Sequence, residues 1–444
     1  MAMAGRVGVA PQGADAADRV RAARLLQRLS FGPAPDEYPA ALDAGVAATL
    51  ARIMAGATAA GATGTDVPPP ALPPVTVPGL AGTPVRAAQQ SALIVWWLDR
   101  MTTSAQPLLE RLTWFWHGHW ATSNVKVRDA GLMLQQNETL RASAFGPFPT
   151  MARAMLRDPA LLLWLDGFGN RRGHPNENLA RECMELFTLG VGNYSEADVR
   201  AAARALTGWY LDPRTRTAAF DVRAFDPGPE TILGATQAFD VDSLVDHIVA
   251  QPACPAFLST RLWRNLVSDV GPTPTELADA SAALTPTMDP TLLVAAIAHL
   301  LIEDPTPRPL AKAPVPWLIG VLRSLGLTVG SLPAGTQGAV LGDLAAMGQV
   351  PFLPPNVSGW PAGGLWFTAA STQARYRLSL ALVAAADLAW LASVPASSRA
   401  AAVADRLGVP AWTPATATAL AGAARSPHDL LVIALNAPEY LVGV

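Results

Sequence analysis

The sequence predicts an all-α fold: a large multi-helix domain with long irregular loops and at most small β-hairpins. Three observations support this class. No stretch longer than a few residues alternates between apolar and polar like a strand. Half of the residues are hydrophobic and only 15% are charged, which indicates extensive internal packing. Apolar residues recur at helical spacing, at Leu25, Leu26 and Leu29, at Ile94, Trp97, Leu98 and Met101, and at Leu292, Ala295, Ala296, His299 and Leu300.

Three irregular stretches separate the predicted helices. Prolines block regular structure in the Pro/Gly-rich segment 57–86, which we expect to be a linker or a surface loop. Any small hairpins are expected near residues 210–240, and segment 350–368 combines prolines with glycines. Loops of this length often form functional rims or lids. We predict a single large helical domain, 1–444, with possible lobes 1–210 and 241–444.

Charge and composition exclude several classes of partner. The formal charge is −3, with 32 basic and 35 acidic residues, so we expect neither nucleic acid nor a membrane as partner. The two cysteines, Cys183 and Cys254, are too few for a disulfide scaffold. No apolar run has the length of a signal peptide or a membrane span, so we expect a cytoplasmic protein. Phosphate-loop and dinucleotide motifs are absent, so no nucleotide cofactor is expected; the oligomeric state stays open.

An acidic stripe marks segment 174–189. On an ideal helix, Asn178, Glu182 and Glu185 fall on one arc with Arg181 beside them, opposite an apolar arc. Carboxylates three residues apart can approach one ion or share one proton. The alternative is a solvated helix face on which Arg181 pairs with Glu185.

A second polar group lies within a tryptophan-rich segment. His117 and His119 are two of six histidines, and residues two apart on a continuous helix point about 200° away from each other. Joint binding of one ion therefore requires a break, which Gly118 permits. Neutral imidazoles joined by carboxylates favour zinc or non-haem iron. The alternative is a hydrogen-bonded pair of core histidines.

Five motifs carry a resemblance to a known family. They are FWHGHWATS at 115–123, QNETLR at 136–141, NENLARECMELFTLG at 176–190, ARALTGW at 203–209 and PPNVSGWPAGGLW at 354–366. With these motifs, the chain resembles the bacterial family catalogued as domain of unknown function 1800, over nearly its whole length. The resemblance implies no assigned activity, but its polar motifs in an apolar chain indicate a site. The chain departs from the pattern at Phe225, where we expect many relatives to carry histidine before Asp226.

The leading hypothesis is a metal-dependent enzyme, an oxidase or oxygenase that acts on a small or peptidic, aromatic or apolar substrate in specialised metabolism. A divalent transition metal, iron or zinc, would be held by His117, His119 and Glu182 or Glu185. Two alternatives stay open: a hydrolase that uses a metal or the two glutamates as acid and base, and a non-catalytic helical scaffold. The remaining expected roles are catalysis by Arg181 and Arg141, substrate contact by Trp116, Trp120, Asn137, Asn356 and Trp360, and support of the site by Asn176, Glu177, Asn178 and Asp226.

Overall fold

The computed structural model describes residues 15–58, 67–73, 82–285, 287–304 and 306–443. Helices dominate, and the strands within these ranges form three two-stranded antiparallel sheets, which confirms the predicted all-α class. None of the described helices is long and apolar enough to cross a bilayer.

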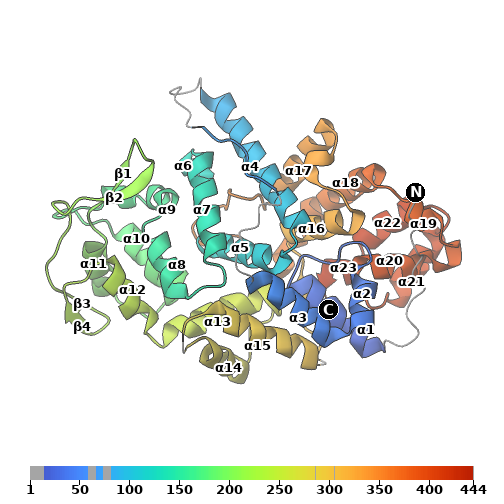
Figure 1. Cartoon of the computed structure of the whole chain (residues 1–444), viewed down its shortest axis with the longest axis horizontal. Helices are drawn as coiled ribbons and strands as arrows, with labels where there is room; N and C mark the ends of the chain where they lie inside the picture. The colour runs from blue at the N-terminus through green and yellow to red at the C-terminus, as the bar shows by residue number, and fades with distance from the viewer. Residues whose placement is uncertain (1–14, 59–66, 74–81, 286, 305, 444) are drawn as a thin grey trace.

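Among the helices before the first hairpin, α3, α4 and α7 pack against α5, which lies near the middle of the molecule (Figure 1). Asparagine and aspartate side chains cap several of them by accepting the backbone N–H groups that the first turn leaves unpaired. Their bounds are α1 (Ala16–Arg28), α2 (Glu37–Ala44), α3 (Val46–Thr58), α4 (Thr83–Thr103), α5 (Pro107–His119), α6 (Asn124–Val127), α7 (Ala130–Ala142), α8 (Phe148–Met155), α9 (Pro159–Trp164), the 3-10 turn η2 (Gly167–Gly169), α10 (Glu177–Glu182), the π-helix η3 (Cys183–Thr188) and α11 (Glu196–Ala205).

The remaining helices follow the hairpins. In Figure 1, α12 lies near the hairpins, whereas the helices after α15 gather at the opposite end. Their bounds are α12 (Val241–Val249), α13 (Ala253–Leu266), α14 (Pro274–Leu284), α15 (Pro290–Glu303), α16 (Pro314–Leu325), η4 (Val329–Ser331), α17 (Ala334–Ala346), η5 (Gly363–Trp366), α18 (Ala369–Ala385), α19 (Ala389–Ala392), η6 (Ala396–Ser398), α20 (Arg399–Leu407), α21 (Pro414–Ala423), α22 (Pro427–Leu435) and α23 (Pro438–Leu441).

Two small hairpins occupy the region where the sequence predicted them. Strand β1 (Trp209–Asp212) pairs with β2 (Thr217–Phe220), and β3 (Glu230–Ile232) pairs with β4 (Ala235–Gln237), both antiparallel. A third pair joins distant parts of the chain: β5 (Leu310–Ala311) lies against β6 (Val442–Gly443), with Ala311 opposite Val442.

The prediction of a loop over 57–86 was wrong at both ends. Helix α3 continues to Thr58 and α4 begins at Thr83, because proline is tolerated in a first turn, where Pro84 stands. The described stretch 67–73 packs against α4: Trp96 Nε1 donates to the Val67 carbonyl at 3.0 Å. The middle of the predicted loop, residues 59–66 and 74–81, lies outside the described residues.

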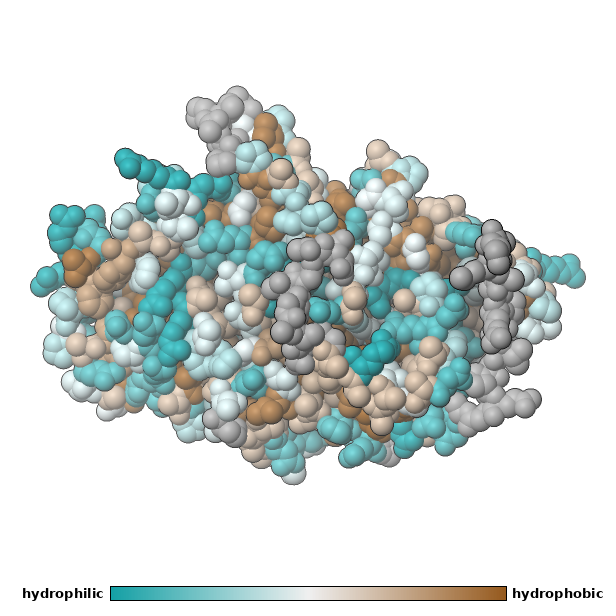
Figure 2. Space-filling view, viewed as in Figure 1, coloured by the Kyte–Doolittle hydropathy of each residue, from teal (hydrophilic) through white to brown (hydrophobic). Residues whose placement is uncertain are grey.

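Two hydrophobic clusters meet at α5. Leu112, Phe115 and Trp116 on this helix belong to a cluster that includes residues of α1, α8 and α10 to α15. Trp114 points instead into a second cluster, built with residues of α4 and α16 to α22. Teal and brown residues are interspersed on the surface in Figure 2, as expected for a chain whose apolar side chains are mostly internal.

Candidate functional site

The two histidines of α5 point in different directions. His117 Nε2 accepts the Phe352 N–H at 3.0 Å, whereas His119 Nε2 donates to the Phe187 carbonyl at 2.9 Å. Helix α5 runs through Gly118 to His119 without a break, so the expected break was wrong. The helix leaves the two side chains on opposite sides and does not bring them to one ion.

Burial keeps both imidazoles neutral. Desolvation lowers the pKa of His117 to about 3, and it also holds the pKa of His119 well below the ordinary value. Within the described residues, no three or more His, Cys, Asp or Glu side chains are arranged to hold a metal ion. The metal site, with iron or zinc, therefore stays a prediction from the sequence.

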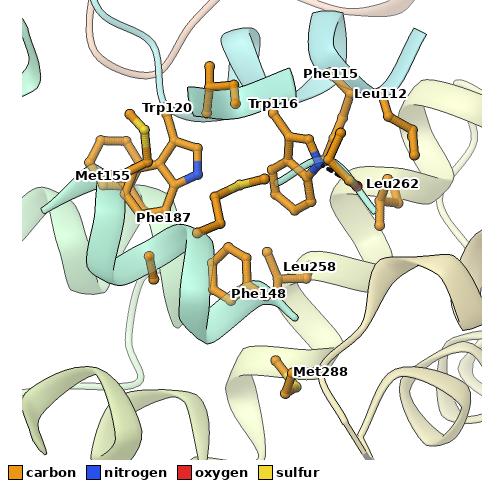
Figure 3. Close-up of a cluster of buried hydrophobic side chains, with 14 of the residues drawn as sticks. Leu112, Phe115, Trp116, Trp120, Phe148, Met155, Phe187, Leu258, Leu262 and Met288 are labelled. Carbon is orange, nitrogen blue, oxygen red and sulfur yellow. Dashed lines mark hydrogen bonds between the residues drawn. The ribbon is translucent and has the colours of Figure 1, made fainter. Parts of the chain in front are cut away.

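Trp116 and Trp120 lie in the hydrophobic core. The Trp116 ring stacks on Phe148 with centroids 5.7 Å apart, and the Trp120 ring contacts Phe187 at 4.5 Å (Figure 3). Both tryptophans are fully buried, and neither lines a cavity found among the described residues. They lie on the face of α5 that packs against α8 and the π-helix, and their contact with substrate stays a prediction from the sequence.

The acidic stripe departs from ideal helical phasing. After α10 the chain forms the π-helix η3, where Leu189 N–H donates to the Met184 carbonyl. The Tyr194 hydroxyl donates to Glu185 at 2.5 Å. Burial and the Glu185 charge raise the pKa of Glu182. Both carboxylates are half-buried, and the structure does not place them with His117 or His119 in a metal-binding group.

Arg181 belongs to a surface ion-pair network. Its guanidinium donates to Glu196 at 2.6 and 2.7 Å and to Glu177 at 3.2 Å. The expected surface pair of Arg181 with Glu185 was therefore wrong in its partner, because α11 brings Glu196 closer. The structure gives Arg181 and Glu177 a role in joining α10 to α11.

Predicted supporting residues fix the backbone. Asn176 caps α10 by accepting the Asn178 N–H at 3.0 Å, and Asn178 Nδ2 donates to the Leu165 carbonyl at 3.2 Å. Asp226 accepts from Arg204 Nε at 2.9 Å. These hydrogen bonds tie loops to α10 and α11 and place none of these side chains in the cavity described below.

Three other predicted residues also lie away from that cavity. Arg141 is fully buried and bound to Glu110, an acidic residue that the sequence analysis missed. Asn137 is buried on α7, where neither amide atom has a hydrogen-bond partner among the described residues. Asn356 accepts the Ser358 N–H at 3.0 Å in an exposed turn. Glu110 on α5 and Glu138 on α7 pair with Arg141 inside the protein, and its catalytic role stays a prediction from the sequence.

A cavity of about 200 Å³ lies between α1, α5, α13, β5 and the 360–366 loop. Trp360, predicted to contact substrate, is one of its walls, and His119 also reaches it. Its aromatic lining residues are Phe31, Trp114, Phe115, Trp360 and Trp366.

Positive charge dominates this cavity. The described lining contains one carboxylate, Asp269, which accepts the Ala311 N–H at 2.7 Å. Against it stand five basic side chains, Arg28, Arg111, Arg261, Arg264 and Lys312. They come from four separate segments of the chain. The sequence analysis missed them because no local motif indicates that these segments come together.

Two of these cations, Lys312 and Arg111, each have an atom without a hydrogen-bond partner among the described residues. Lys312 Nζ has no hydrogen-bond partner among the described atoms and lies 3.6 Å from the centre of the Tyr440 ring. Arg111 Nη1 is likewise without one. Burial lowers the pKa of Arg111 to about 10, and burial together with the Arg111 charge lowers that of Arg28 to about 9. The cavity thus holds excess positive charge at an energetic cost.

Comparison with protein families matches this architecture to one family. A family model described as "Protein of unknown function (DUF1800)" matches residues 24–442. The chain belongs to the DUF1800 family. No curated protein and no solved structure matches it.

Two DUF1800 motifs of this chain meet beside the cavity. Trp360 stacks on Trp114 with ring centroids 5.2 Å apart and planes 20° apart. Gly359 adopts a positive φ of 86°, and a Cβ there would stand 2.5 Å from the Gly118 carbonyl oxygen. The loop therefore lies directly on the end of α5, and Gly359 permits this close approach.

Proposed function

We propose that this chain is an enzyme that binds a small organic anion, a carboxylate on a flat or apolar group, in the cavity beside α5. The observation that carries the proposal is the excess of five basic side chains over one carboxylate in the described cavity lining, with Arg28, Arg111 and Lys312 buried. Buried cations without counter-charges destabilise a protein, and an anionic ligand offsets that cost.

The cavity lining suits a carboxylate on an apolar group. Arginine presents a planar fork of donors that matches a carboxylate, and Arg111 has an unused Nη1. Trp114 and Trp360 provide flat apolar walls. A ligand with its carboxylate toward the arginines and its apolar part toward the tryptophans matches both the charged and the apolar parts of the lining.

His119 supplies a basic atom at this site. Its Nε2 donates a proton to the Phe187 carbonyl, so the Nδ1 atom carries the lone pair. That Nδ1 has no hydrogen-bond partner in the described structure. A neutral imidazole in this state can accept a proton from a bound substrate, while the surrounding cations stabilise the negative charge that develops.

Anion binding tests the proposal directly. Titration calorimetry with benzoate, phenylacetate and inorganic phosphate should show carboxylate binding that weakens with added salt. Arg264→Gln removes one exposed cavity cation, and we expect it to weaken benzoate binding about 5- to 20-fold. Arg223→Gln makes the same change in net charge on a highly exposed side chain outside the cavity and should leave affinity unchanged. Absence of carboxylate binding, or equal effects of the two variants, would contradict the proposal.

A further inference from the structure

We infer that Lys312 is a nucleophilic amine that forms an imine with the aldehyde or ketone group of a carboxylate held in the cavity. The inference deepens the proposed function and depends on it, because the arginines must first hold the carboxylate. It narrows the ligand to an oxo acid.

Lysine is rare in this chain. Only two of its 32 basic residues are lysines, Lys126 and Lys312. Lys126 is a surface residue whose side chain is 42% exposed and which pairs with Asp166 at 2.8 Å. Arginine stays protonated and is a poor nucleophile, whereas a lysine amine can lose its proton and attack a carbonyl. A lysine at the cavity, where arginine supplies the other cations, therefore indicates a role beyond charge.

The backbone holds Lys312 in place on both sides. Its N–H donates to the Leu441 carbonyl at 2.8 Å, and its own carbonyl accepts from Arg375 Nη2 at 2.9 Å. The side chain lines the cavity and is almost completely buried, with Nζ against the face of the Tyr440 ring. The unpartnered Nζ is thus a fixed, water-poor atom on a residue that lines the cavity.

The surroundings favour the neutral amine. Arg28 on α1 repels a charge on Lys312, and Arg264 on α13 adds a further positive charge to the cavity. Tyr440 presents its ring, and Asp269, the one carboxylate in the described lining, accepts the Ala311 N–H and interacts with Arg28 and Arg264. Burial, followed by the charge of Arg28, lowers the pKa of Lys312 well below its ordinary value. More of this amine is therefore neutral near pH 7 than for an exposed lysine.

The reaction is a condensation. The Nζ lone pair attacks the carbonyl carbon of the bound oxo acid, and the carbonyl oxygen takes up a proton to give a carbinolamine. Nitrogen then releases a proton, and the hydroxyl group leaves as water after taking a second proton. The product is an imine that already carries a proton on nitrogen, and this cation lies beside the bound carboxylate and can act as an electron sink. No oxidant or reductant is needed.

Reductive trapping tests the inference on the full-length protein. Glyoxylate carries both a carboxylate and an aldehyde, and cyanoborohydride reduces its lysine imine to a stable carboxymethyl adduct that peptide mass mapping locates. Near pH 7 we expect the adduct on Lys312 of the unaltered protein to form at least about tenfold faster than with propanal, a neutral aldehyde. Benzoate should slow labelling of Lys312 and leave that of Lys126 unchanged.

Two variants of matched design separate the lysines. Lys126→Arg should leave the Lys312 adduct unchanged, and Lys312→Arg should retain benzoate binding within about threefold because the cavity arginines that hold the carboxylate stay in place. Benzoate binding without a Lys312 adduct in the unaltered protein would overturn the imine inference and leave the proposed function standing. Failure of both benzoate and glyoxylate to bind would overturn the two together.

Discussion

Glu110 on α5 and Arg141 on α7 form a buried ion pair with two hydrogen bonds, Nε to Oε1 at 2.6 Å and Nη2 to Oε2 at 3.0 Å. Arg100 Nε and Trp97 Nε1, both on α4, donate to the same carboxylate at 2.8 and 3.0 Å. The pairing lowers the pKa of Glu110 despite its complete burial. One carboxylate thus links α4, α5 and α7.

Neutralising this carboxylate should be strongly destabilising. Glu110→Gln removes the one fully buried counter-charge that Arg141 and Arg100 share, and we expect a loss of about 3–5 kcal/mol in the free energy of unfolding. Urea denaturation measures this. Glu138→Gln is the matched control, because Glu138 pairs with Arg141 from a half-exposed position and should cost below about 1 kcal/mol. Similar stabilities for the two variants would show that the buried pair is not needed.

The contact between the loop and α5 predicts a steric effect at Gly359. Alanine there faces both a positive φ and the Gly118 oxygen, so Gly359→Ala should lower stability by about 2 kcal/mol or more. Gly342→Ala, in the open middle of α17, should instead raise stability by about 0.5–1 kcal/mol. Thermal unfolding of both variants checks the opposite signs, and a neutral Gly359→Ala would argue against this close approach.

Asp158 predicts a pH dependence of stability. Burial raises its pKa to about 6, above the 3.8 expected for the unfolded chain. The folded state therefore binds a proton that the unfolded state releases, and stability falls as pH rises from about 4 to about 6, by up to about 3 kcal/mol. Asp158→Asn should remove this part of the pH dependence. Chemical denaturation of both proteins at several pH values measures how the free energy of unfolding changes with pH. The same change in both proteins would exclude Asp158 as the source of this pH dependence.

Trp360 predicts selectivity for ligands with aromatic groups. Trp360→Ala removes the stacked wall beside Trp114 and should weaken benzoate binding about tenfold, or about 1.4 kcal/mol. Binding of inorganic phosphate depends on the cations and should change less than about threefold. Calorimetry compares the two anions, and an equal loss for both would assign Trp360 a structural role only.

The fold class could be predicted from the sequence because helical spacing is a local property. The hairpins near 210–240 could be predicted because the irregular stretch that contains them is also a local feature of the sequence. The two errors in helix geometry were also local: α5 does not break at Gly118, and η3 widens the helix after Glu182. Glycine permits a break without requiring one, and a π-helix has no simple sequence signature.

The cavity could not be predicted, because its charges come together only through tertiary packing. Arg28, Arg111, Arg264 and Lys312 stand far apart in the chain and in no shared motif. Among the residues singled out beforehand, Trp360 and His119 do line it. Most others, such as Asn176 and Asp226, hold loops against helices. A polar motif in an apolar chain can therefore serve to stabilise the fold.

Helix α5 also determines how the molecule should melt. Phe115 and Trp114 are adjacent in the chain but pack into different hydrophobic clusters. Loss of either cluster therefore exposes one side of the same helix to solvent. The two ends of the protein should therefore lose their structure together in one cooperative transition. Amide hydrogens of α5 should then be among the slowest to exchange with solvent, since they open only when the whole chain does.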